Sequence, residues 1–234
     1  MKAETILSSG PVALAVAMVL ASPVEAATGI QVGASGQTYA SAGVQCALHP
    51  TLGLAPVVQA GLYNPKRTSS ATVSLNGSPV ATVSFYTPDT NVWLANGANT
   101  VVVALSKRTA DSYTFDASAP GQINICIPDT SSNRVDTTAN LEYAVSGKSY
   151  ATVTPGCAWN ALTGRAQPFI NLFDNGSYLL NVNVNNVPLT QLSSLRRHTP
   201  VFLSAGLNVI SAANAALSTD YYVRDGGTGS CTLP

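Results

Sequence analysis

Two pairs of aspartates are the first candidates for chemistry, because each pair flanks tyrosine at the same spacing. They are Asp111 and Asp116 around Tyr113, and Asp220 and Asp225 around Tyr221 and Tyr222. Glycoside hydrolysis requires two carboxylates, whereas calcium needs a denser set of oxygen ligands, such as a D-x-D-x-D loop, which the chain lacks. A repeated acid more often caps a repeated turn. We therefore expect no metal site and no catalytic residue, and a carboxylate-dependent hydrolase is the least favoured function.

Basic and aromatic residues are the candidates for binding. Three adjacent basic pairs fall in expected loops: Lys66-Arg67, Lys107-Arg108 and Arg196-Arg197. If two such loops met at one end of a domain, they would hold an anionic glycan or a protein carboxylate. Aromatic rings suit sugar stacking, although core packing explains most of them equally well. The candidate binding residues are Lys66, Arg67, Arg196, Arg197, Trp93 and Trp159.

The two histidines, His49 and His198, do not occupy corresponding places in the chain. We expect both to be loop residues rather than general bases or metal ligands. The chain contains no H-E-x-x-H, no G-x-S-x-G and no phosphate-cradling glycine loop. The sequence therefore predicts a protein that is not an enzyme and that has no cofactor.

The N-terminal residues predict export. Lys2 precedes an apolar stretch at residues 11–21, and small residues follow at 24–26. This order is typical of a signal peptide over residues 1–26, with Ala27 as the alternative last residue. The apolar stretch is too short to cross about 30 Å of hydrocarbon. We expect a periplasmic or extracellular protein with no membrane span after cleavage.

The charge balance excludes several partners. Removal of the signal peptide leaves ten basic and nine acidic residues, because Lys2, Glu4 and Glu25 lie within it. Such a balance gives no basic face for a nucleic acid and no bulk attraction to anionic lipid. Charged residues make up only 9% of the chain, against about 25% in typical domains. The surface is therefore rich in Ser, Thr and Asn, and it tolerates close packing against neighbours.

An internal repeat runs through the chain. At an offset of 111, residues 30–64 match residues 141–175, and at an offset of 109, residues 75–99 match residues 184–208. The matched pairs include Tyr39 with Tyr150, Cys46 with Cys157, Gly53 with Gly164, and Leu62 with Phe173. Ordered matches of Gly, Pro, Asn and Cys, with gaps only in expected loops, indicate a duplication.

The four cysteines allow three connectivities, and the repeat selects one of them. Each repeat has one early and one late cysteine, which predicts the disulfides Cys46–Cys126 and Cys157–Cys231. Oxidising compartments favour such pairing. A zinc site is disfavoured, because zinc ligands normally come in close pairs such as C-x-x-C, which the chain lacks.

The local pattern is that of strands. Residues 72–75 and 80–85 alternate around Asn76-Gly77, which predicts a hairpin. Residues 91–94 and 99–105 predict a second hairpin around Asn96-Gly97. Further predicted strands repeat this arrangement at 179–184, 201–203 and 208–211, and residues 212–217 allow a short helical turn. Long helical periodicity is absent.

These observations predict an all-β protein with two tandem Ig-like antiparallel β-sandwich domains, related by internal duplication and with one disulfide each. The domains are expected at residues 27–128 and 141–234, with a polar linker or loose first strand at 129–140. The pattern resembles tandem bacterial extracellular Ig-like modules. It departs from antibody domains, because Trp93 and Trp159 do not form their Cys…Trp…Cys arrangement.

The favoured function is an exported, non-enzymatic structural, adhesion or extracellular-assembly protein. A duplicated rigid sandwich, sparse charge and the lack of a catalytic set point to it, and sandwich edges allow strand addition to a partner. The expected partner is a protein or glycan at the cell surface, including a second copy of the chain. A carbohydrate-binding module is the alternative. A chaperone-usher pilus subunit is related but less favoured, because both repeats look complete.

Overall fold

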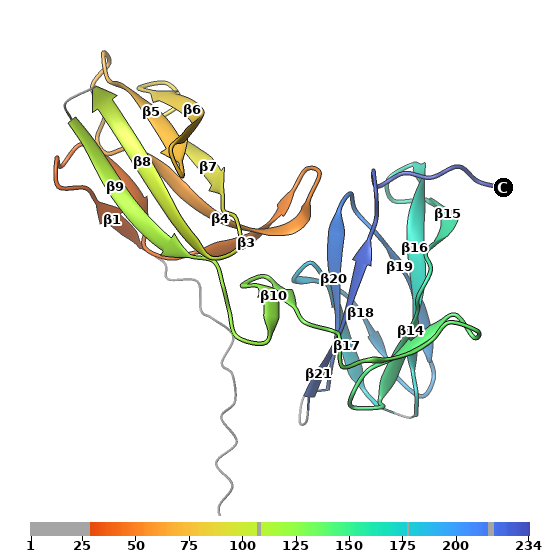
Figure 1. Cartoon of the computed structure of the whole chain (residues 1–234). Helices are drawn as coiled ribbons and strands as arrows, with labels where there is room; N and C mark the ends of the chain where they lie inside the picture. Colours follow the sequence, from red (N-terminus) through yellow and green to blue (C-terminus); the bar gives the residue numbers. More distant parts are fainter. Residues whose placement is uncertain (1–28, 107–108, 177, 215–217) are drawn as a thin grey trace, which may run out of the picture.

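The structure is a computed structural model that describes residues 29–106, 109–176, 178–214 and 218–234. The described residues form strands, turns and loops and contain no helix, which confirms the all-β prediction. Figure 1 shows two lobes, and each has its own hydrophobic core. The predicted signal peptide at 1–26, and the basic pair Lys107-Arg108, lie outside the described residues.

The first lobe contains β1 (Ile30–Val32), β2 (Thr38–Ser41), β3 (Gln45–His49), β4 (Gly53–Leu62), β5 (Ser70–Leu75), β6 (Ser78–Ser84), β7 (Asp89–Trp93), β8 (Ala98–Ser106) and β9 (Thr109–Asp116). A small hairpin of β10 (Gln122–Asn124) and β11 (Ile127–Pro128) follows. The second lobe contains β12 (Arg134–Asp136), β13 (Leu141–Tyr143), β14 (Ser149–Thr152), β15 (Gly156–Asn160), β16 (Arg165–Asp174), β17 (Leu180–Val184), β18 (Val187–Leu192), β19 (His198–Phe202), β20 (Leu207–Asn214) and β21 (Ser218–Asp225).

Both lobes have the same strand order. One layer of the first lobe is β6-β5-β8-β9, and in the other layer β4 pairs with β2, β3 and β7. The second lobe repeats this as β18-β17-β20-β21, opposite a layer in which β16 pairs with β14, β15 and β19. An Ig constant-type domain has the layers ABED and CFG. Each lobe is therefore a β-sandwich, and its strand order differs from that of an Ig constant-type domain.

The hairpin predicted around Asn76-Gly77 is confirmed. Asn76 and Gly77 have φ values of 49° and 84°, and they join β5 to β6 with Leu75 opposite Ser78. Two positive φ values match the twist of the flanking strands, and Asn and Gly tolerate them best. The second lobe uses Asn185 and Asn186 in the same way between β17 and β18.

The hairpin predicted around Asn96-Gly97 is wrong. β7 pairs with β4, whereas β8 pairs with β5 and β9, so this turn carries the chain from one layer to the other. The buried Asn99 amide organises it by accepting from Ala95 N and donating to the carbonyl oxygens of Ala95 and Gly97. Strands β19 and β20, predicted at 201–203 and 208–211, likewise lie in opposite layers around Asn208.

Two further expectations are corrected. Residues 212–214 belong to strand β20, because cross-strand pairing such as Ala212 with Asp220 outweighs the weak helical pattern; residues 215–217 lie outside the described residues. The expected linker at 129–140 contains β12, which pairs with β13 through Arg134 and Tyr143. The alternative of a loose first strand was therefore correct for residues 134–136.

Strand register also shifts the matching of the two lobes by one residue. Cys46 lies opposite Pro56, and Cys157 lies opposite Pro168, so the two prolines correspond. The sequence matches of Gly53 with Gly164 and of Leu62 with Phe173 are therefore wrong by one position. The cause is an additional residue in the β15–β16 turn, which lies between the paired residues 160 and 165, whereas the β3–β4 turn lies between 49 and 53.

The two predicted disulfides are present. Cys46–Cys126 ties β3 to the connection between the lobes, and Cys157–Cys231 ties β15 to the C-terminal segment. They link positions separated by 80 and 74 residues. Closing loops of this length restricts the unfolded chain and contributes about 4–5 kcal/mol each in the chain-entropy model.

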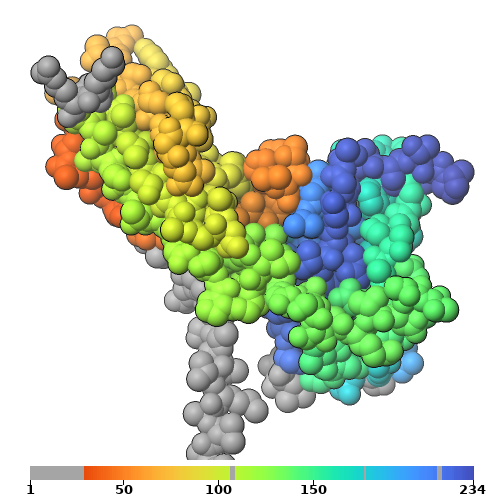
Figure 2. All heavy atoms as spheres, in the orientation of Figure 1, coloured from red at the N-terminus to blue at the C-terminus, as the bar shows by residue number. Residues whose placement is uncertain are grey.

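A third apolar cluster, which we call the joint, lies between the lobes. Its members are Leu54, Ile125, Cys126 and Ile127 from the first lobe and its tail, and Leu207, Val209 and Val223 from the second lobe. Leu207 N donates to Leu52 O at 3.0 Å, and Leu207 forms a parallel bridge with Gly53. Figure 2 shows the β3–β4 hairpin, in orange, against the second lobe.

Glycines permit this close approach of the two lobes. A Cβ added to Gly53 would lie 1.7 Å from Leu207 O, and a Cβ added to Gly206 would lie 2.2 Å from the carbonyl carbon of Leu52. Both glycines have positive φ, of 81° and 71°. The joint therefore depends on backbone contacts that no other residue type allows at these two positions.

Candidate functional site

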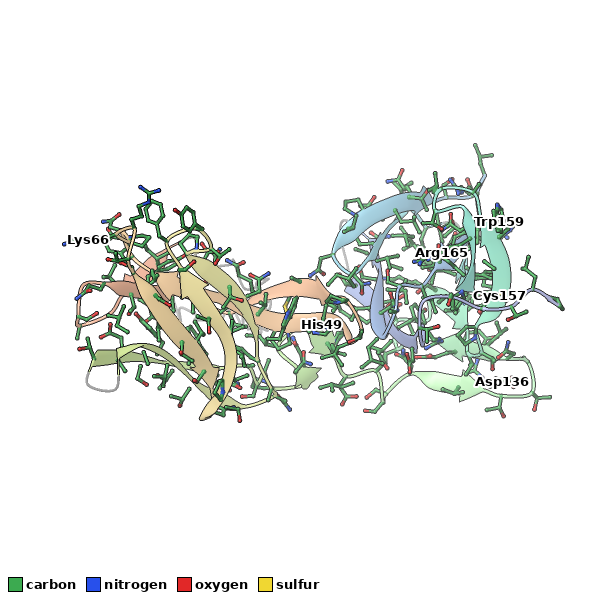
Figure 3. All side chains as sticks on the ribbon, turned by 90° about the horizontal axis from the view of Figure 1, so that it is seen from above. His49, Lys66, Asp136, Cys157, Trp159 and Arg165 are labelled. Carbon is green, nitrogen blue, oxygen red and sulfur yellow. A yellow bond between two sulfur atoms is a disulfide. The ribbon has the colours of Figure 1, made fainter. Side chains whose placement is uncertain are left out.

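The basic pair Lys66-Arg67 lies on the loop between β4 and β5, at the end of the first lobe that points away from the second lobe (Figure 3). This loop meets the loop between β6 and β7. Phe85 N donates to Ser69 O at 3.2 Å, and Arg67 Nε donates to the phenol oxygen of Tyr86 at 3.3 Å. We call Lys66, Arg67, Phe85 and Tyr86 the loop tip. The loop with the basic pair therefore meets an aromatic loop here, and not a second basic loop.

The loop tip is organised by local contacts. Lys66 N donates to the hydroxyl of Ser69 at 2.9 Å, and Ser69 N donates back to Lys66 O at 2.8 Å. The rings of Phe85 and Tyr86 contact each other edge to face, with centroids 5.3 Å apart. Tyr86 nevertheless stays 73% exposed. An ordered base and an open aromatic ring therefore lie together in solvent.

The second-lobe basic pair, Arg196-Arg197, differs, because both residues make hydrogen bonds within the lobe. Arg196 donates from Nη1 to the hydroxyl of Thr190 at 2.9 Å and from Nη2 to the hydroxyl of Thr199 at 3.4 Å. The carbonyl of Arg197 accepts from Asp174 N. These residues lie on the turn between β18 and β19. The structure therefore does not bring the two predicted basic pairs into one site.

The two tryptophans are also apart. Trp93 is half-buried and contacts His49 edge-on, with ring centroids 4.7 Å apart. His49 Nδ1 accepts from the backbone N–H groups of Thr51 and Leu52, so His49 shapes the β3–β4 turn. Trp159 lies on the second lobe (Figure 3), opposite Ala166 of the paired strand, and is 59% exposed. The tryptophans form no shared platform.

The aspartate pairs do not converge on a substrate. In β9, Asp111 faces the core, whereas Asp116 is exposed, as expected for strand residues an odd number of positions apart. In β21, Asp220 is buried and Asp225 is exposed in the same way. Asp116 accepts from the Ser118 hydroxyl at 2.6 Å and from Ser118 N at 2.9 Å, and these two hydrogen bonds lower the pKa of Asp116 as they cap the turn. Neither pair presents two carboxylates on one face.

Asp111 instead organises a buried hydrogen-bond network. Its carboxylate accepts from Ser35 N at 3.0 Å, from the Ser35 hydroxyl, and from the Thr38 hydroxyl at 2.6 Å. The Thr38 hydroxyl also contacts the Tyr113 phenol at 2.6 Å. Burial acts to raise the pKa of Asp111, but the hydrogen bonds from Ser35 and Thr38 outweigh it and lower the pKa. Burial raises the pKa of Tyr113.

The second lobe has a network of the same kind. Asp220 accepts from the hydroxyls of Ser146 at 2.8 Å and Ser149 at 2.7 Å. Ser149 also contacts the phenol of Tyr222 at 2.7 Å, and burial raises the pKa of Tyr222. Both networks fasten the turn after the first strand of the repeat to the last strand. In both lobes the buried aspartate therefore holds strands and turns together.

A row of stacked side chains on the outer face of the second lobe was not foreseen. It crosses five strands and consists of Arg134, Tyr143, Tyr150, Phe173 and His198, each paired with the next across the strands. The guanidinium carbon of Arg134 lies 4.1 Å from the Tyr143 ring centroid. The distance between ring centroids is 5.3 Å from Tyr143 to Tyr150, 4.8 Å from Tyr150 to Phe173, and 5.9 Å from Phe173 to His198.

The three inner rings of the stacked row have no face open for a sugar. Tyr143, Tyr150 and Phe173 have neighbours on both faces, and Arg134 and His198 close the two ends. Sugar stacking needs an accessible ring face, so the inner rings do not suit a saccharide. The corresponding first-lobe row differs, since Gly61 lies between Tyr39 and Asp89. Burial and the hydrogen bond to Asp89 raise the pKa of Tyr39 to about 12.

Within the described residues, no group of three or more His, Cys, Asp or Glu side chains is arranged to hold a metal ion. The described part of the chain also contains no helix of the length and apolarity needed to cross a membrane.

Comparison with known proteins gives little beyond this geometry. No protein-family profile matches the chain, and no curated protein matches it significantly. Among solved structures, the chain is similar to the central fibronectin-III array of RIM-binding protein. The match has 13% sequence identity, covers 87% of this chain and 73% of that chain, and has a TM-score of 0.24. The description of each lobe as a β-sandwich rests on its own strand pairing.

Proposed function

We propose that the protein is an exported, non-enzymatic structural, adhesion or extracellular-assembly protein built from duplicated β-sandwich modules. The joint carries this proposal. It fixes one sandwich on the other through Gly53, Gly206 and an apolar cluster, where a flexible linker would leave them independent. A rigid pair of modules holds its loops at a fixed separation, which suits binding or assembly.

Recurring contacts support the duplication. Asp111, Ser35 and Thr38 make the same network as Asp220, Ser146 and Ser149. Asn99 and Asn208 organise the same layer-crossing turn. Two copies of one ancestral module would retain such contacts, because loss of either would leave buried polar groups unpaired.

The placement of the acids supports a non-enzymatic protein, since the aspartates of each pair occupy opposite faces of a strand. The two disulfides support export, because oxidising compartments favour and preserve them. Both features agree with a periplasmic or extracellular scaffold.

Cell fractionation with size analysis tests the proposal. We expect the native protein outside the cytoplasm, with an N-terminus at Ala27 or Thr28 and no free thiols. We also expect it to self-associate or to be retained on the cell surface or matrix. A cytoplasmic protein with reduced cysteines would contradict export. A strictly monomeric protein without any surface partner would contradict the assembly or adhesion part.

A further inference from the structure

The guanidinium of Arg67 has an orientation suited to an oxyanion. Its Nε is engaged by the phenol of Tyr86. Within the described residues, its two terminal nitrogens make no hydrogen bond. A guanidinium held by one edge presents the other edge as a planar fork, which matches the two oxygens of a carboxylate or sulfate.

The positive charge of the loop tip is not neutralised by the fold. The salt bridge among described residues joins Arg224 to Glu142 in the second lobe. Neither Lys66 nor Arg67 has a carboxylate partner among the residues that the structure describes. Two adjacent bases therefore remain available to an external anion, in a chain that otherwise carries few charges.

The aromatic side of the loop tip favours a sugar over a protein. Tyr86 is 73% exposed and Phe85 is 40% exposed, beside the fork. One ring and one guanidinium match the size of a single anionic sugar residue. A stable protein interface uses about 20–30 residues on each side, whereas the loop tip is defined by Lys66, Arg67, Phe85 and Tyr86.

We propose that the loop tip binds an anionic saccharide, in which a carboxylate or sulfate group contacts Arg67 and Lys66 while the sugar ring packs on Tyr86. This assignment rests on the proposed function, since it names the ligand class through which an exported scaffold attaches to its surroundings. Neither the second-lobe arginines nor the stacked row offers such a site, because Arg196 is already bound and the faces of the row's inner rings are covered.

The test uses the full mature chain and four polymer probes in titration calorimetry. Polygalacturonate carries carboxylates, dextran sulfate carries sulfates, dextran is neutral, and polyglutamate is a polyanion without sugar rings. We expect binding to polygalacturonate or dextran sulfate, and which of them binds identifies the anionic group. We expect no binding to dextran and at least about tenfold weaker binding to polyglutamate, equivalent to about 1.4 kcal/mol.

Matched variants locate the site. Arg67→Lys keeps the charge but loses the fork, and we expect it to weaken binding by about tenfold or more, as for a hydrogen bond between charged groups. Tyr86→Ala removes the ring and should weaken binding similarly. Arg196→Lys is the control and should bind as the unaltered protein does. Unchanged thermal unfolding would show that the exposed Arg67 and Tyr86 variants are folded.

Equal binding of polyglutamate, equal loss in Arg67→Lys and Arg196→Lys, or no binding to either anionic polysaccharide would each overturn the saccharide site. The proposed function would survive those results if fractionation still placed an assembled protein outside the cell. A cytoplasmic location would overturn the proposed function even if the loop tip bound the probes.

Discussion

At the scale of single residues, buried hydrogen-bond acceptors decide what the conspicuous side chains do. Asp111 receives two hydroxyl donors and one backbone donor, so its charge is used inside the first lobe. Glu142 is paired with Arg224 at 2.6 Å, and both side chains are buried. Such groups are costly to unpair. Of the four aspartates that the sequence pattern offers for catalysis, Asp111 and Asp220 thus hold strands together, whereas Asp116 and Asp225 are exposed turn residues.

The substitution Asp111→Asn tests, at neutral and acidic pH, whether the buried carboxylate stabilises the first lobe. The folded-state pKa of Asp111 lies below its ordinary value, so its stabilisation is fully present above the unfolded-state value of about 3.9. It is lost as pH falls through the lower folded-state pKa. We expect Asp111→Asn to lose about 2 kcal/mol at pH 7 and to show a weaker acid dependence of stability between pH 5 and 2. Urea unfolding across that range measures both effects.

Asp116→Asn is the control, because Asp116 is exposed and only caps a turn. Equal stability losses for the two variants at pH 7 would contradict the structural part given to the Asp111 network.

At the scale of elements, register brings together residues that the chain keeps apart. The stacked row joins Tyr143, Tyr150, Phe173 and His198 only because four strands align them. Phe173 lies at its centre, with its ring nearly parallel to Tyr150, at an interplanar angle of 6°. The row therefore fixes the alignment of the outer layer of the second lobe.

Phe173→Leu should destabilise the second lobe while leaving the first unchanged. Leucine keeps most of the apolar area but loses the ring contacts with Tyr150 and His198. Each aromatic pair contributes about 0.5–1.5 kcal/mol beyond burial, so we expect a loss of about 1–3 kcal/mol by chemical denaturation. Leu195→Ala serves as the control, because Leu195 is 98% exposed. An unaltered midpoint for Phe173→Leu would show that the stacking contributes nothing.

At the scale of the whole molecule, the joint determines how the lobes are placed. The Cys46–Cys126 disulfide contributes to it, because Cys126 lies between Ile125 and Ile127 in the apolar cluster. The residues of one lobe that form the joint are not found at the equivalent positions of the other lobe. In the first lobe, Thr100 and Thr114 occupy the positions that Val209 and Val223 occupy in the second lobe. In the second lobe, Arg165 occupies the position that Gly53 occupies in the first lobe. The equivalent positions of the two lobes therefore differ in residue type, and the joint uses a different surface on each lobe.

Gly206→Ala and Gly97→Ala separate the joint from turn strain. Both glycines have positive φ, so both substitutions cost about 1–2 kcal/mol in backbone strain. An added Cβ at Gly206 meets the backbone of Leu52 at 2.2 Å, whereas one at Gly97 meets nothing within 4 Å. We expect only Gly206→Ala to increase the radius of gyration in X-ray scattering and to expose residues 118–133 to protease.

Identical scattering curves for the two glycine variants would contradict a joint built on backbone contact. A larger radius for Gly97→Ala alone would also contradict it, since that turn faces open space.

Features that depend on neighbours along the chain, or on a repeated spacing, could be predicted from the amino-acid sequence. Alternating residues and Asn76-Gly77 determined the β class and one hairpin. The repeated cysteines determined both disulfides. The basic character of Lys66-Arg67 was also visible, as was its place in a loop. These signals are local, or they recur with the duplication, so they can be recognised without knowledge of packing.

Four features could not be predicted before the strands were packed: the layer crossing at Asn96-Gly97, the stacked row, the joint, and the hydrogen bond between Arg67 and Tyr86. Each depends on register between strands or on contact between loops, and a shift of one residue, as between Leu62 and Phe173, reverses the face of a strand. Ile125 and Ile127 beside Cys126 were the one visible sign of the joint, as apolar residues in a polar segment. Their contacts with Val209 and Val223 come from packing between distant parts of the chain, which sequence spacing does not encode.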